Sequence, residues 1–140
     1  MSRESISDKQ SVSHHINDIR YQRNRPEFQG AFAQMTGESD LVFVEGKLPV
    51  GEGEVQNELP IEQQTGLCLE RLDEELSHHD LGLNDVLETT MYLSELDSYE
   101  EANEAYIQYF ESLYPARTTI GVAELLGGAG IMVRAIAEMP

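Results

Sequence analysis

The most regular pattern of apolar and polar positions lies between Pro60 and Asp80. Residues on one side recur at spacings of three and four: Ile61, Thr65, Cys68, Leu69, Leu72 and Leu76. Acidic residues fill the positions between them, so the pattern predicts an amphipathic helix with one stripe facing a core. Pro60 suits the first turn of this helix, which should end near His78 and His79.

A second helical pattern begins at Ser98 and stops at Pro115. Ser98 and Glu101 have the spacing of a capping box, in which the two side chains bond free backbone N–H groups at the helix start. Apolar side chains follow at helical spacing: Tyr99, Ala102, Tyr106, Phe110 and Leu113. The pattern predicts a second helix with one apolar face.

Shorter segments have the composition of β-strands. Residues 31–36 and 41–46 flank a polar link and predict a hairpin, after which a loop is expected at 49–53. Residues 85–93 are rich in β-branched and aromatic side chains and predict a strand. Residues 117–125 and 131–138 flank a glycine-rich turn and predict a second hairpin.

The predicted element order is β-β-α-β-α-β-β. One mixed β-sheet backed by two helices is the economical arrangement, because each helix has a single apolar stripe to bury. At 140 residues the chain is long enough for one core. We therefore expect an α+β domain at residues 29–140, preceded by a polar tail or arm at residues 1–28.

The net charge of the chain says more about its partners than its overall composition does. The formal net charge is −17, and residues 29–140 carry 4 basic against 22 acidic side chains, a net of −18. Such a surface repels phosphate backbones, which weighs against nucleic acid as a partner. The same pattern is typical of proteins adapted to a salt-rich cytosol, such as those of halophiles; an ordinary acidic soluble protein is the alternative.

Other features point to a cytoplasmic protein. No apolar run approaches the roughly 20 residues of a membrane span, and the N-terminus lacks the apolar segment of a signal peptide. The lone cysteine, Cys68, cannot form an internal disulfide and is expected in the core. The pairs His14-His15 and His78-His79 lack further ligands at a defined spacing, so we expect no metal site.

Arg117 is one of only four cations in residues 29–140 and opens a β-type segment. A single cation in so acidic a segment needs an explanation.

Element order and local motifs together resemble the RidA/YjgF/YER057c/UK114 family. The motifs that carry the resemblance are Gly30-Ala-Phe-Ala-Gln, Leu41-Val-Phe-Val-Glu-Gly-Lys-Leu-Pro, Asp85-Val with Thr89-Thr-Met-Tyr-Leu, Ala102-Asn-Glu-Ala-Tyr, Pro115-Ala-Arg-Thr and Ala135-Ile-Ala. The resemblance covers about Gly30 to Ala137. It implies a chorismate-mutase-like subunit that assembles as a homotrimer, with small-molecule pockets at the subunit interfaces.

The resemblance also implies an activity. The best-known members hydrolyse enamines and imines such as 2-aminoacrylate to 2-keto acids and ammonia, without metal or cofactor. In those members the arginine at the position of Arg117 binds the substrate carboxylate, and the resemblance implies the same role for Arg117. A guanidinium offers parallel donors that match a carboxylate, which a lysine cannot reproduce. The backbone around Gly46 and Thr119 would lie beside the same pocket.

Three positions depart from the deaminase pattern. Phe32 stands where a tyrosine is usual, Glu45 where a serine is usual, and Met132 where a glutamate is thought to position water. Glu45 could pair with Arg117, replace the missing glutamate as an acid/base group, or point to solvent.

These observations leave two functions open. One is a RidA-like hydrolase of enamine or imine intermediates, or a relative acting on another small carboxylate. The other is a non-catalytic trimer that binds a small carboxylate or 2-keto acid as a sensor or regulator. Ribonuclease activity, attributed to some relatives, conflicts with the acidic charge.

Overall fold

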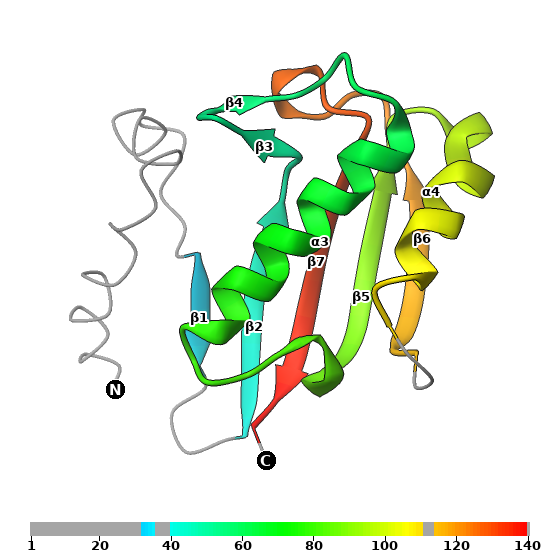
Figure 1. Ribbon diagram of the computed structural model, residues 1–140. Coiled ribbons are helices and arrows are strands. Elements are labelled where there is room, and N and C mark those ends of the chain that lie inside the picture. The colour runs from blue at the N-terminus through cyan, green and yellow to red at the C-terminus, as the bar shows by residue number, and fades with distance from the viewer. Residues whose placement is uncertain (1–31, 36–39, 111–113, 140) are drawn as a thin grey trace.

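A computed structural model describes residues 32–35, 40–110 and 114–139 of the 140-residue chain. Within these residues, helices pack on one face of a mixed β-sheet (Figure 1), which confirms the expected α+β fold. The strands and α-helices in chain order are β1 (Ala33–Met35), β2 (Leu41–Lys47), β3 (Val50–Gly51), β4 (Glu54–Val55), α3 (Ile61–Ser77), β5 (Val86–Leu93), α4 (Tyr99–Ile107), β6 (Ala116–Gly121) and β7 (Ile131–Glu138). The tail expected at residues 1–28 lies outside the described residues.

The strand order of the five-stranded sheet is β1-β2-β7-β5-β6. Neighbouring strands run antiparallel, except β5 and β6, which are parallel. The predicted hairpin of β6 with β7 is therefore wrong. Because α4 connects β5 to β6 as a crossover, β6 lies parallel on the far side of β5. The chain then returns through a turn, in which Gly127 and Gly128 have positive φ, and β7 inserts between β2 and β5.

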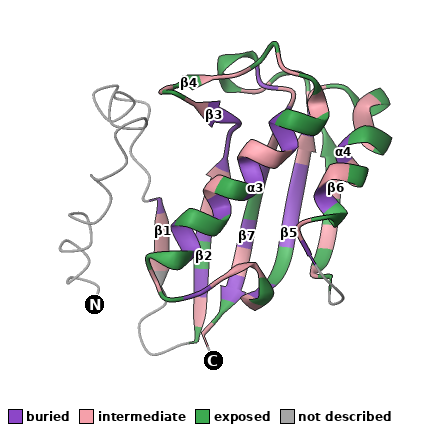
Figure 2. Cartoon of the chain, in the orientation of Figure 1, coloured by how far each residue is buried: buried purple, intermediate pink, exposed green. Residues whose placement is uncertain are grey.

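The core lies between the helices and one face of the sheet. Strand β7 alternates strictly: its odd-numbered residues, Ile131 to Ala137, are buried, and its even-numbered residues are partly or fully exposed. The apolar stripe of α3 is confirmed, since Cys68, Leu69, Leu72 and Leu76 are all fully buried. Figure 2 shows these buried positions in purple along α3, β7 and β5. Burial raises the pKa of the Cys68 thiol, as expected of a core cysteine.

Strand β2 contains a bulge at Glu45 and Gly46. Its register with β7 pairs Val44 with Ala135 and Lys47 with Val133, so β2 holds one extra residue. A Cβ atom at Gly46 would lie 2.7 Å from the Met132 sulfur, so a larger residue there would require the Met132 side chain to move. Lys47 directly follows the bulge, and its side chain contacts Glu75 on α3.

Two local predictions need correction. Residues 49–53, expected as a loop, include one strand of a small hairpin of β3 and β4, whose turn residues Glu52 and Gly53 both have positive φ. Ser98 makes no side-chain cap; a short 3-10 turn at Leu96–Ser98 leads directly into α4. In the part of the chain described here, no helix is both long and apolar enough to cross a membrane.

Candidate functional site

Arg117 lies on β6, at the edge of the sheet, and its side chain faces α4. Its Nη2 donates a hydrogen bond to the Tyr99 hydroxyl at 2.6 Å. Its guanidinium carbon lies 4.6 Å from the centre of the Tyr106 ring and 5.5 Å from that of the Tyr99 ring. Two tyrosines of one helix therefore hold the guanidinium by a hydrogen bond and by cation–π contacts.

Tyr106 is itself held in place. Its hydroxyl lies 2.7 Å from the Thr89 hydroxyl on β5, and both residues are buried. Burial raises the pKa of Tyr106, although the Thr89 hydrogen bond and the charge of Arg117 oppose the rise. The ring beneath the guanidinium is consequently a neutral, fixed surface at ordinary pH.

The guanidinium has no carboxylate partner within residues 32–35, 40–110 and 114–139. This is unusual for a cation in so acidic a chain. Arginine carries several N–H donors in a planar fork, and the hydrogen bond to Tyr99 uses one of them. The remaining donors suit an anion with two oxygens, such as a carboxylate.

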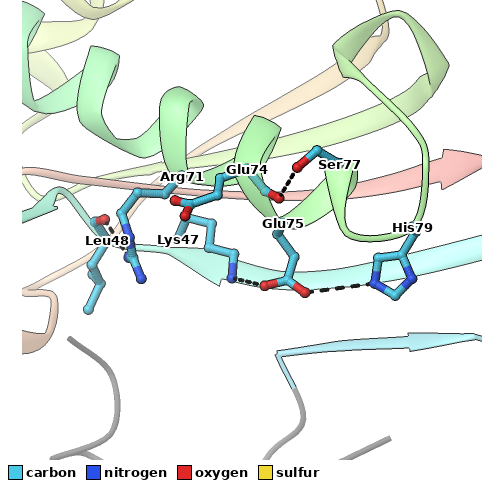
Figure 3. Close-up of polar contacts among 7 residues, drawn as sticks. All are labelled: Lys47, Leu48, Arg71, Glu74, Glu75, Ser77 and His79. Atoms are coloured by element: carbon cyan, nitrogen blue, oxygen red, sulfur yellow. Dashed lines mark hydrogen bonds and ion pairs between the residues drawn. The ribbon is translucent and has the colours of Figure 1, made fainter. Parts of the chain in front are cut away.

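A second polar cluster surrounds Lys47 (Figure 3). The Lys47 ammonium lies 3.3 Å from Glu75 Oε1, and both side chains are almost completely buried. The other carboxylate oxygen of Glu75 lies 3.7 Å from His79 Nε2. Burial alone would raise the pKa of Glu75, but His79 and Lys47 outweigh it and hold that pKa at about 2. Arg71 donates to the Leu48 carbonyl at 3.1 Å beside this pair.

Glu45 lies near this second cluster. Burial raises the pKa of Glu45, Lys47 opposes the rise, and Glu75 adds to it. Its backbone N–H bonds the Phe32 carbonyl at 3.1 Å, and the Phe32 ring centre lies 5.6 Å from the Lys47 ammonium. Glu45 is partly buried. It lies on β2, with strands β7 and β5 between it and β6, so within one chain it does not contact Arg117.

The residues expected to form the site fall into two groups. Arg117 and Thr119 lie two positions apart on β6 and share a face of the strand. The second group lies around β2 and β7: Phe32, Glu45, Gly46 and Met132. Strand β5 lies between Met132 and the group on β6, and both β7 and β5 lie between the β2 residues and that group. At about 4.8 Å per strand, the distances to β6 are roughly 10 Å from Met132 and roughly 14 Å from the β2 residues.

Sequence reasoning missed the residues that support these cations. The sequence pattern places Tyr99 and Tyr106 on the apolar stripe of the helix, and their spacing of seven does put both on one face, but it gives no sign of their contact with a cation. The Lys47–Glu75 pair joins residues 28 positions apart and leaves no local signal. Among the residues that the structure describes, no three His, Cys, Asp or Glu side chains are grouped as a metal site would need. His14 and His15 lie outside those residues.

Comparison with known proteins gives consistent matches over most of the chain. The family model described as Endoribonuclease L-PSP matches residues 22–139. A RutC family protein of Pyrococcus horikoshii is 29% identical over 124 residues, which cover 87% of this chain and 98% of that protein. The chloroplastic Reactive Intermediate Deaminase A of Arabidopsis thaliana is 32% identical over 116 residues, 81% of this chain and 62% of that protein.

Solved structures agree with the fold. A crystal structure of a Thermotoga maritima protein is 31% identical, with a TM-score of 0.73, over 80% of this chain and 87% of that one. The structure of Escherichia coli TdcF with bound serine has a TM-score of 0.73 at 24% identity, over 80% of this chain and 89% of its own.

Proposed function

Because the chain belongs to the Endoribonuclease L-PSP family, which includes the RidA/YjgF deaminases, we propose that it hydrolyses reactive enamine or imine intermediates. The substrates would be small carboxylates of the 2-aminoacrylate type, and the products 2-keto acids and ammonia. The proposal needs no metal or cofactor. The deaminase name of the Arabidopsis relative supports the reaction class.

The observation that carries the proposal is the state of Arg117. Its guanidinium is fixed by Tyr99 and Tyr106, is partly exposed, and has no carboxylate partner among the described residues. A fixed cation with unused donors selects a ligand that carries a carboxylate and orients it.

The chemistry asks little of the protein beyond this orientation. The enamine takes a proton from solvent at its terminal carbon and becomes an iminium ion. Water then adds to the iminium carbon and returns one proton to solvent, and the resulting carbinolamine expels ammonia as its hydroxyl becomes the carbonyl of the 2-keto acid. Arg117 would hold the carboxylate throughout, so that the reacting carbon stays at one place in the pocket.

We propose further that the site is completed between subunits of a homotrimer. The group on β6 and the group around β2 and β7 lie too far apart in one chain to surround a small ligand. A neighbouring subunit would place its own Phe32, Glu45, Gly46 and Met132 against this subunit's Arg117. Light scattering should give the mass of a trimer, and a monomer that still binds a carboxylate would contradict this arrangement.

A coupled assay tests the reaction. The protein is added to a pyridoxal-phosphate enzyme that releases 2-aminoacrylate, and the rate of pyruvate formation is measured in dilute buffer and in molar salt. Faster pyruvate formation in either buffer supports the hydrolase. Equal rates with and without the protein in both buffers would reject it. The salt comparison also tests the proposed adaptation to a salt-rich cytoplasm.

A non-catalytic carboxylate-binding trimer is the second candidate. Met132 cannot transfer a proton and Phe32 has no hydroxyl, so the anchor is retained without two of the usual polar groups. Such a protein would be stabilised by 2-ketobutyrate or benzoate without producing pyruvate. The charge of −17 argues against an RNA substrate for either candidate.

A further inference from the structure

We propose that Tyr99 is a second ligand-binding residue, which sets the position of Arg117 and donates its own O–H to the same carboxylate. This inference rests on the proposed carboxylate site and adds a residue to it. Tyr99 is the first residue of α4, and its partly exposed side chain reaches across to β6.

The direction of the Tyr99–Arg117 hydrogen bond supports this role. Arginine can only donate, so the Tyr99 oxygen accepts the bond from Nη2 at 2.6 Å. A tyrosine that accepts still has its own O–H to donate. Apart from Arg117, no described residue is hydrogen-bonded to this hydroxyl. An unused O–H donor therefore lies beside the unused N–H donors of Arg117.

The surroundings fix both donors in one place. The Tyr106 ring lies 4.6 Å from the guanidinium carbon, and the Tyr106 hydroxyl is tied to Thr89 on the neighbouring strand. Tyr99 begins a helix that follows the 3-10 turn Leu96–Ser98, so its backbone is held at both sides. Donors that are positioned before the ligand arrives lose less conformational entropy on binding.

Arg117 and Tyr99 together form what we call a clamp, which contains two kinds of hydrogen-bond donor. The charged fork of Arg117 provides the attraction, and the neutral hydroxyl of Tyr99 adds a hydrogen bond from the side. A planar carboxylate has lone pairs enough to accept from both groups, whereas a neutral carbonyl would gain little from the charge. The clamp thus favours a carboxylate over a neutral carbonyl compound.

The test measures binding of 2-ketobutyrate and of benzoate to the full chain by titration calorimetry. Tyr99→Phe removes the hydroxyl and keeps the ring, and should weaken binding about 10- to 100-fold with an unchanged melting temperature. Tyr109→Phe is the matched control: it removes a hydroxyl hydrogen bond to Glu70 at 3.0 Å on another surface, and binding should stay at the wild-type level.

A double variant tests whether Tyr99 acts together with Arg117. In the Arg117→Gln background, Tyr99→Phe should cause little further loss, because the two residues act on one carboxylate. If Tyr99→Phe binds the probes with the same dissociation constant as wild type, the proposed role of Tyr99 is wrong, while the proposed function is unaffected. Tighter binding in Tyr99→Phe would also overturn it, since Tyr99 would then compete with the ligand. If the wild-type protein binds neither 2-ketobutyrate nor benzoate, both this inference and the proposed function are wrong.

Discussion

Arg117 and Lys47 are both cations that extend from strands toward the helices, yet their surroundings differ completely. Lys47 is 3% exposed and lies against Glu75, with His79 on the far side of that carboxylate. Arg117 is partly exposed and lies against Tyr99 and Tyr106. The same formal charge is neutralised inside the protein in one case and left available in the other.

The difference shows which cation is suited to bind a ligand. A buried ion pair satisfies its own charges, and separating the partners is costly. Aromatic rings hold a cation without cancelling its charge, so the attraction for an external anion remains. We therefore propose a structural role for Lys47 and a ligand-binding role for Arg117, and the following variants test this contrast.

The largest effect is expected from Glu75→Ala. This variant leaves the Lys47 ammonium buried without its partner, and should lower the free energy of unfolding by about 3–5 kcal/mol. Denaturant unfolding measures the loss. The double variant Lys47→Met with Glu75→Leu is the control and should lie much closer to wild type. A loss below about 1 kcal/mol in Glu75→Ala would show that the pair is not the structural element described.

The next effect concerns Arg117→Gln. Removing the guanidinium should weaken binding of 2-ketobutyrate about 100-fold or more, while the free energy of unfolding changes by less than about 1 kcal/mol. Arg134→Gln, on the exposed side of β7, is the matched control and should bind normally. If Arg117→Gln instead unfolds the protein and Glu75→Ala abolishes binding, the two roles are reversed.

The pH dependence of the free energy of unfolding should show the contribution of the Glu75 ion pair. Its folded-state pKa of about 2 lies below the ordinary value of 4.5, so its ion pair stabilises the fold fully above that value. The stabilisation is lost as the pH falls from about 4.5 to about 2. Unfolding of wild type and Glu75→Gln is compared from pH 7 to pH 2, and the difference between them should shrink toward the acid end. A difference that is constant across this range would contradict the assignment.

The smallest effect is expected from Glu45→Gln. The pKa of Glu45 is raised, mainly by burial, so the charged form costs stability at neutral pH. Glu45→Gln should therefore raise the free energy of unfolding at pH 7, and this gain should shrink as the pH falls through the raised pKa and be absent only below the ordinary value of 4.5. Glu62→Gln, at an exposed position of α3, provides the control. A destabilised Glu45→Gln would mean that the carboxylate is needed within the Lys47 cluster.

Much of the fold follows from local patterns. The stripe that includes Leu69, Leu72 and Leu76 defines α3, and the alternation along β7 separates its two faces, because burial follows the helical and strand periods directly. Strand order does not follow in the same way. The glycines before β7 do form a turn, but the turn leads β7 to β2 and β5, and long-range pairing decides its place.

The candidate site was predictable only in part. The motif Pro115-Ala-Arg-Thr points to Arg117 and the family resemblance to Thr119, and the structure places both on one face of β6. Their roles in binding stay predictions. The sequence does not predict the roles of the Tyr99 and Thr89 hydroxyls, because these roles depend on how α4 crosses β5 and β6. A helical pattern gives the direction of a side chain, but not the partner at its tip.

The central position of β7 has a consequence for how the protein is made. β7 pairs with both β2 and β5 in the middle of the sheet, yet it is the last of the described strands to be synthesised. Until it leaves the ribosome, the facing edges of β2 and β5 have no partner strand. The apolar stripe of α3 also lacks the buried side chains of β7 against which it packs. The sheet therefore closes only after translation of residue 138, and a nascent chain that stops before Ile131 cannot complete its core.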